Sequence, residues 1–267
     1  LINKNRESDT LNYWFKGIET DSLKFEYPIK DSIKTELVNF KNPIKDSLII
    51  TQITIGAIDL TDIFKVKSNL PIVSSDSSLV KIRKKDSTLI PAKIKIDKNY
   101  DRVEIDFKLI PNDMYDIELL PNALKDFWGN THDTLYYRVS TKKVEDYGNI
   151  FIQLIYEDSS EFILELLKDN KVIKSYNQSV EDSNYSFKLL NPGKYFLRLI
   201  KDSNNNDKWD TGNYLKKIQP EEVIYYPFEL ELRANWDLNE TFNTTQKYLD
   251  LLKTRTSSDT LKEIDDQ

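Results

Sequence analysis

The feature that most constrains the fold of this chain is an alternation of apolar and polar residues with a period of two. Residues 94–96, 103–107, 195–199 and 228–232 show it, and their apolar positions hold Ile, Val, Leu, Phe and Tyr. Side chains two residues apart lie on the same face of a strand. The pattern is therefore typical of strands that are buried on one face.

Turn residues separate these segments at Lys98-Asn99, Pro111-Asn112-Asp113, Asp169-Asn170 and Asn191-Pro192-Gly193. Asn, Asp, Pro and Gly favour the backbone angles that tight turns require. Many short strands with such punctuation indicate β-sandwiches and not parallel α/β sheets. The sequence therefore predicts an all-β protein built of tandem antiparallel β-sandwiches.

The pattern divides the 267 residues into four parts. Residues 1–56 are expected to form an N-terminal β unit, read as part of an incomplete sandwich, and residues 57–142 a second unit. Residues 143–236 are expected to form a third unit, which begins with a linker. Residues 237–267 are expected to form a polar tail with a short helix within 246–253.

Composition excludes several classes of site. The net charge of −6 does not suit an electrostatic nucleic-acid binder, so no nucleic-acid partner is expected. The chain has no cysteine and one histidine, His132, which excludes thiolate chemistry and makes a His-based triad improbable. His132 itself is expected in a surface turn. With six glycines in all, no glycine-rich phosphate loop occurs. The expectation is a protein that is not an enzyme.

The sequence begins at Leu1. We interpret it as a fragment whose N-terminal part, with any targeting signal, lies upstream.

Two stretches between residues 57 and 142 carry a resemblance to a known family. Asn69-Leu70-Pro71-Ile72 and the turn Asp126-Phe127-Trp128-Gly129-Asn130 before a final strand resemble the start and end of bacterial Ig-like domains of the S-layer type. The spacing agrees over most of residues 57–142. The resemblance implies an Ig-like sandwich there.

The third unit resembles another group. Leu190-Asn191-Pro192-Gly193-Lys194-Tyr195 is similar to a strand of transthyretin-like and collagen-adhesin B-type sandwiches. The order of these units resembles the C-terminal half of Ig-like cell-envelope lipoproteins of Bacteroidota. That resemblance implies a location, an outer-membrane lipoprotein facing the periplasm or the cell surface and anchored by an upstream lipidated cysteine, more than it implies an activity.

A cluster of Asp and Asn runs from Lys201 to Asn213 and matches the start of an EF-hand-type loop. Ca²⁺ binds carboxylate, amide and carbonyl oxygens at alternate positions of such loops. The candidate ligands, for a structural Ca²⁺, are Asp202, Asn204, Asn206, the carbonyl of Lys208, and Asp210.

The loop departs from that motif at two positions. Asp207 stands where Gly is usual, and Asn213 stands where a bidentate Glu is usual. The second departure would lower the affinity for Ca²⁺ or leave the last ligand to another segment, with Glu221 or Glu222 as candidates. The alternative is a polar turn that needs no ion, with Trp209 packed on the sheet. Both interpretations stay open at this point.

Asp followed by Ser or Thr and an apolar residue recurs along the chain. This resembles the acceptor motif of protein O-glycosylation in Bacteroidota, although Asp-Ser before a strand is also favourable turn chemistry. The candidate acceptors are Thr10, Ser22, Ser32, Ser47, Thr134 and Thr260.

Three functions are compatible with these features. The first is a scaffold or interaction subunit of the outer membrane or cell surface, an accessory lipoprotein whose partners are outer-membrane or surface proteins. The second is a carbohydrate-binding or adhesive module with a glycan partner, which predicts a coplanar aromatic pair on one face, with Trp128, Trp209 and Trp236 as candidates. The third is an accessory region of a larger envelope enzyme. Membrane contact is expected through the upstream lipid anchor alone.

Overall fold

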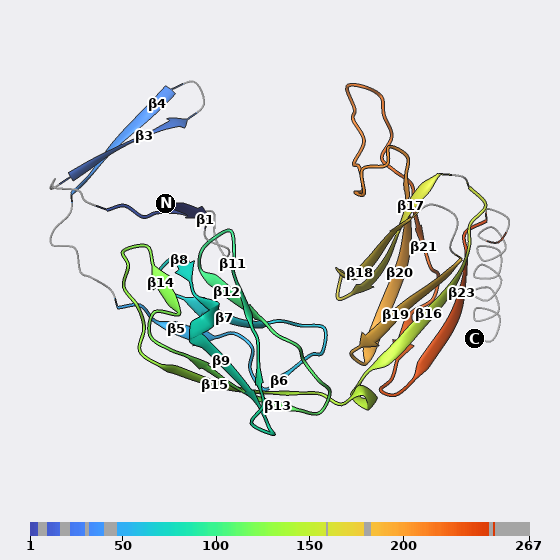
Figure 1. The fold of residues 1–267 in the computed structure, drawn as a ribbon. Helices are drawn as coiled ribbons and strands as arrows, with labels where there is room; N and C mark the ends of the chain where they lie inside the picture. Colours follow the sequence, from blue (N-terminus) through green and yellow to red (C-terminus); the bar gives the residue numbers. More distant parts are fainter. Residues whose placement is uncertain are drawn as a thin grey trace, which may run out of the picture. The chain divides into compact units, whose positions relative to one another are not determined.

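The structure is a computed structural model that describes residues 1–4, 10–16, 22–29, 32–39, 47–158, 160–178, 183–245 and 248. The chain divides into two compact units, residues 1–142 and 143–267. Among the described residues, neither unit contains a helix long and apolar enough to cross a membrane. Both units are built almost wholly of strands, which confirms the predicted all-β class (Figure 1).

The first unit begins with two small sheets. Strands β1 (Ile2–Lys4) and β2 (Leu11–Tyr13) pair with each other, and strands β3 (Ser22–Ile29) and β4 (Ser32–Asn39) form an antiparallel hairpin. All eight residues of β4 are exposed.

The rest of the first unit is a sandwich. One sheet has the order β10-β9-β13-β15-β6, a second has the order β11-β12-β7-β5, and β14 pairs with β8. Their bounds are β5 (Ile50–Gln52), β6 (Ala57–Ile58), β7 (Phe64–Ser68), β8 (Ile72–Ser75), β9 (Val80–Lys84), β10 (Leu89–Ile90), β11 (Lys93–Ile96), β12 (Arg102–Asp106), β13 (Met114–Leu119), β14 (Leu124–Asp126) and β15 (Leu135–Thr141), with a 3-10 turn η1 (Ser77–Leu79).

Alternation places the core between these sheets. Phe64, Ile82, Ile105 and Ile117 are fully buried and belong to one apolar cluster, while their polar neighbours along each strand face outward. Strand β5 belongs here because it pairs with β7. Residues 50–52 fall within the predicted N-terminal unit, residues 1–56, but the pairing shows that they complete this sandwich.

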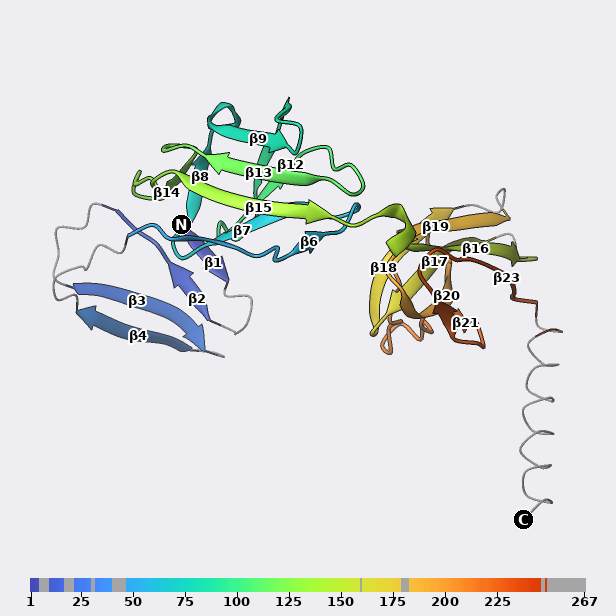
Figure 2. The same cartoon turned by 90° about the horizontal axis from the view of Figure 1, so that it is seen from below.

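The second unit is a sandwich of two sheets. One has the order β19-β16-β23, and the other has the order β18-β17-β20-β21, with β22 pairing with β20 as well. Their bounds are β16 (Gly148–Ile155), β17 (Glu161–Lys168), β18 (Lys171–Gln178), β19 (Asn184–Leu190), β20 (Gly193–Asp202), β21 (Val223–Tyr225), β22 (Leu230–Leu232) and β23 (Asp237–Asn243), preceded by a 3-10 turn η2 (Val144–Asp146). Figure 2 shows the two units from a second direction.

The last strand corrects the predicted boundary of the tail. Strand β23 runs parallel to β16 over its whole length, from Asn149 opposite Asp237 to Ile155 opposite Asn243. Phe242 on β23 is fully buried in the core of this unit. The segment looks polar because Asp, Asn and Thr occupy its outward positions and Glu240, on the inner face, accepts a hydrogen bond from Tyr226. Apart from Tyr248, residues 246–253 and the rest of the tail lie outside the described residues.

Two of the turns used for the resemblance have a clear physical role. The buried carboxylate of Asp126 accepts hydrogen bonds from the backbone N–H groups of Trp128 (2.9 Å) and Asn130 (2.7 Å) and from the Asn130 amide (2.9 Å). Tyr195, after the Pro-Gly turn, is buried and donates its hydroxyl proton to the carbonyl of Asn191 at 2.6 Å. Each motif therefore fixes a turn against a core.

Candidate functional site

The Asp- and Asn-rich loop connects β20 to β21 and extends beyond the end of its sheet, drawn in orange in Figure 1. Asp202, the last residue of β20, is buried, and its two carboxylate oxygens accept from the N–H groups of Asn206 (3.1 Å) and Asp207 (2.8 Å). Asp207 has a φ of 60°, so it adopts the left-handed conformation for which the EF-hand motif uses glycine. Asp202 thus closes the first turn of the loop.

The other candidate ligands form a second group. The side-chain amides of Asn204 and Asn206 both donate to one carboxylate oxygen of Asp210, the latter at 2.8 Å. The N–H of Lys208 donates to the Asn206 side chain at 2.9 Å. The structure therefore brings Asp202, Asn204, Asn206, Lys208 and Asp210 into one loop, where they satisfy one another by hydrogen bonds.

Glu221 holds the two ends of the loop together. Its buried carboxylate accepts from the N–H and hydroxyl of Ser203 (2.9 and 3.1 Å) and from the N–H of Asp210 (3.1 Å). The backbone of Glu221 bonds Asp210 again, and its carbonyl accepts from the indole N–H of Trp209 at 3.2 Å. Glu222 instead forms an exposed ion pair with Lys201 at 2.8 Å, and this contact raises the pKa of Lys201.

The residues fit the calcium prediction only in part. Within the described ranges, no group of three or more His, Cys, Asp or Glu side chains is placed to hold a metal ion. The carboxylates of Asp202, Asp210 and Glu221 all face N–H donors in this structure. Asn213, at the usual position of the bidentate Glu, accepts from the N–H of Lys216 at 3.0 Å and so serves a turn. Calcium at this loop stays a prediction.

A melting experiment on the whole chain tests that prediction. An ion that binds the native state alone stabilises it, so the calcium interpretation expects a higher melting temperature in millimolar Ca²⁺ than in EGTA. Asp210→Asn should remove the difference because it removes a charged ligand. Equal melting temperatures of the parent protein in Ca²⁺ and EGTA would leave the hydrogen-bonded turn as the correct interpretation.

The tip of this loop exposes three apolar side chains. Asn213 and Ile218 exchange both backbone hydrogen bonds (2.9 and 3.0 Å) and enclose Tyr214, Leu215 and two lysines. Tyr214 is 95% exposed, Leu215 90% and Ile218 58%. At Gly212 (φ 77°) a Cβ would lie 2.6 Å from the backbone nitrogen of Pro220, so only glycine lets the two sides of the loop approach.

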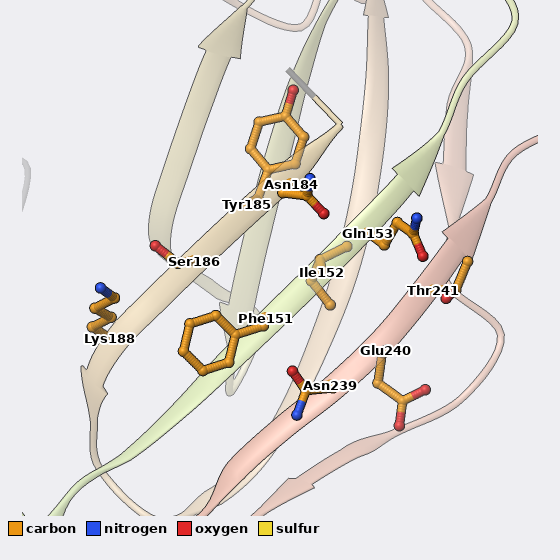
Figure 3. Close-up of a pocket in the computed structure, with 10 residues that line it drawn as sticks. All are labelled: Phe151, Ile152, Gln153, Asn184, Tyr185, Ser186, Lys188, Asn239, Glu240 and Thr241. Atoms are coloured by element: carbon orange, nitrogen blue, oxygen red, sulfur yellow. The ribbon is translucent and has the colours of Figure 1, made fainter.

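A second candidate site lies on the outer face of the sheet β19-β16-β23. A depression of about 640 Å³ there is lined by side chains from all three strands (Figure 3). The register places Phe151 between Ser186 and Asn239. The next row along the sheet has Gln153 between Asn184 and Thr241.

Within each unit, the ring contacts found for the described tryptophans include no coplanar pair of the kind that a carbohydrate-binding module predicts. Trp128 packs edge-to-face on Trp14, with ring centroids 5.6 Å apart and planes at 76°. Trp209 donates to the loop backbone, and the Arg233 guanidinium lies over the ring of Trp236 at 4.9 Å. Each ring thus has a partner within its own unit.

The remaining sequence predictions concern single residues. His132 is buried and not in a surface position as expected, and its Nδ1 lies 2.6 Å from the carbonyl oxygen of Asp133. The candidate glycosylation acceptors Thr10, Ser22, Ser32, Ser47 and Thr134 lie at or shortly before the starts of strands, as both interpretations of the motif require. Thr260 lies outside the described residues, and modification of these sites stays a prediction.

Sequence reasoning missed both surfaces. Phe151 lies in the run Ile150–Ile155, which reads as a buried strand, and the polar residues at 149 and 153 were the signal that position 151 faces outward. The acidic residues are the more prominent feature of the loop that carries the tip. Three apolar residues between Gly212 and Pro220, inside a loop, were the available signal.

Comparisons with known proteins do not assign the chain to a family. No protein-family model matches the chain, and no curated protein matches it. Among solved structures it is similar to the N-terminal part of the bacterial S-layer protein SbsC, at 14% identity and a TM-score of 0.33, covering 58% of this chain and 41% of that one.

Two further structures are similar in the same degree. A part of the alpha-2-macroglobulin of Escherichia coli that spans domains MG0-NIE-MG1 matches at 8% identity and a TM-score of 0.34, covering 70% of this chain and 90% of that one. The major pilin subunit of Bacillus cereus matches at 10% identity and a TM-score of 0.25, covering 88% and 80%. At such TM-scores the similarities carry no functional conclusion for this chain.

Proposed function

We propose that the chain is a non-enzymatic scaffold or interaction subunit of the bacterial outer membrane or cell surface, an accessory lipoprotein of an outer-membrane protein complex. We further propose that it docks its partner through the tip of the β20–β21 loop, residues 213–218. The location rests on the resemblance of the sequence to envelope lipoproteins. The docking tip rests on the structure.

The observation that carries the docking proposal is an anchored loop with an apolar tip. Single exposed apolar residues are common on protein surfaces and need no explanation. Here Tyr214 and Leu215 are adjacent and almost fully exposed, while buried carboxylates of Asp202 and Glu221 hold the base of the same loop. An anchored loop loses less conformational entropy on binding than a free one.

The tip specifies the chemistry of its partner. Tyr214, Leu215 and Ile218 require an apolar pocket, and tyrosine is frequent among the residues that dominate binding energy. Lys216 and Lys217 lie between them and favour acidic groups at the rim of that pocket. The partner is therefore a surface or outer-membrane protein with an apolar pocket that has an acidic rim.

Cross-linking in the native membrane tests this proposal. A photoreactive amino acid at position 215 is expected to cross-link one protein, identified by mass spectrometry, and the yield should fall when Tyr214→Ser is added. The same group at Ile55, which is 86% exposed in the first unit, is the matched control. Cross-linking of the same protein from both positions would contradict docking at the tip.

Two further results would overturn the proposal in different ways. Cosedimentation with protein-free vesicles of phosphatidylethanolamine and phosphatidylglycerol, lost in Leu215→Ser, would identify a lipid surface as the partner in place of a protein. Recovery of the chain in the cytoplasmic fraction of its source cell would contradict the envelope location. Purification under mild detergent with no co-purifying protein would contradict the complex.

A further inference from the structure

The outer face of the sheet β19-β16-β23 differs from the other outer faces of this protein. Elsewhere, outward residues of neighbouring strands form ion pairs, such as Arg83–Glu118 (3.3 Å), Arg138–Asp116 (2.6 Å) and Arg198–Glu165 (2.6 Å). The two rows around Phe151 instead hold amides, hydroxyls and one aromatic ring. In a chain that is 31% charged, these two uncharged rows are distinct, and the charges nearest to them are Lys188, which also lines the depression, and Asp237 in the adjacent row.

Most polar side chains of these rows are available to a ligand. The amides of Asn184 and Asn239 each donate one long hydrogen bond, of 3.4 Å, to a residue close in sequence. In the described part of the chain, the side chains of Gln153, Ser186 and Thr241 make no hydrogen bond within the protein. Amides and hydroxyls both donate and accept, so they suit a ligand that also carries both functions. Neighbours across strands are about 4.5–5.5 Å apart, so polar groups lie on both sides of the Phe151 ring within reach of one bound ring.

We propose that this face binds a neutral saccharide chain. Phe151, which is half-buried, offers its ring to the C–H face of a sugar, and the amides of Gln153, Asn184 and Asn239 with the hydroxyl of Thr241 bond the sugar hydroxyls (Figure 3). A few placed polar groups around an apolar contact are the usual design of such sites. The depression lies open along the sheet, so internal units of a chain can enter it.

The β19 edge of this sheet is not free to pair with an added protein strand. The hydroxyl of Tyr176 donates to the carbonyl of Ser186 at 2.6 Å, and the amine of Lys174 donates to the carbonyl of Lys188 at 2.9 Å. These contacts occupy acceptors on the outer edge of β19 that an added strand would need. Partial burial lowers the pKa of Lys174. The β19 edge is therefore a poor site for an added strand.

Binding to polysaccharides tests the proposal with the whole chain. Native gel electrophoresis with neutral polysaccharides (a β-glucan, a mannan, a xylan and a galactan) in the gel should show retardation by at least one of them, little affected by salt. Phe151→Ala should weaken that retardation at least about tenfold, as loss of a central aromatic contact usually does. Tyr136→Ala, at an outward aromatic that is 72% exposed in the first unit, is the matched control and should leave binding unchanged.

A second variant covers the case in which Phe151→Ala misfolds. Gln153 is exposed, so Gln153→Ala should not disturb the fold. The variant is expected to weaken binding by roughly threefold to tenfold because it loses one hydrogen bond to the saccharide. Absence of binding to all four polysaccharides would overturn the proposal. So would binding that both face variants leave unchanged, or binding restricted to anionic polysaccharides. Because the docking tip lies on a different loop, none of these results bears on the proposed protein partner.

Discussion

Phe242→Ala is expected to lower the free energy of unfolding of the second unit by about 3–5 kcal/mol. The Phe242 side chain is fully buried, packs edge-to-face on Tyr226 at 5.5 Å, and belongs to the main apolar cluster of that unit. Its removal leaves a cavity that the surrounding β-sandwich cannot fill without strain. For a unit of this size the melting temperature should fall by at least about 10 °C.

Scanning calorimetry of the whole chain measures this effect. The two compact units can unfold separately, so one transition should move and the other should stay. Asn239→Ala is the matched control on the same strand, because it removes an exposed side chain and should cost less than about 1 kcal/mol. An unmoved transition in Phe242→Ala would place residues 237–243 outside the sandwich.

Glu221→Ala is expected to release the β20–β21 loop from its sheet. The variant leaves the N–H groups of Ser203 and Asp210 without their acceptor, and each unsatisfied donor in a partly buried site costs about 1–3 kcal/mol. Hydrogen exchange should therefore rise sharply at both N–H groups, while strands β16 and β17 keep their protection. Cross-linking through position 215 should fall because the tip loses its fixed position.

Glu222→Ala provides the comparison for this prediction. Glu222 adjoins Glu221, but its side chain is 59% exposed and its ion pair with Lys201 should contribute less than about 1 kcal/mol. Exchange at Ser203 and Asp210 should be unchanged in that variant. Equal exchange in both variants would mean that the Glu221 carboxylate does not anchor the loop.

The strands with clear alternation were predictable from local chemistry. A strand that is half-buried must place its apolar residues two apart, and residues 94–96, 103–107 and 195–199 therefore gave a reliable signal. The turns were also predictable from sequence. Asp169 and Asn170, between β17 and β18, both have positive φ, as the residues of a tight hairpin turn require. In each case the information lies within about ten residues of sequence.

Local sequence patterns did not predict which unit each strand belongs to. Strand β5 pairs with β7, and β23 pairs with β16 across nearly ninety positions of sequence, as the register of Asn149 with Asp237 shows. Neither segment has a strong local pattern. Their place follows from sheet edges that other strands create, so it depends on contacts that are distant in sequence.

Some features of the candidate sites likewise depend on local sequence, and others depend on tertiary structure. By itself the sequence determined the strands with clear alternation, the turns and the oxygen-rich composition of the loop from Asp202 to Asp210, because these depend on residues that are neighbours in the chain. Only the tertiary structure decided that Glu221 anchors this loop, that Tyr214 and Leu215 form its exposed tip, and that Phe151 lies among Gln153, Asn184 and Asn239. These sites are set by pairing between distant strands, which places side chains together that no short stretch of sequence contains.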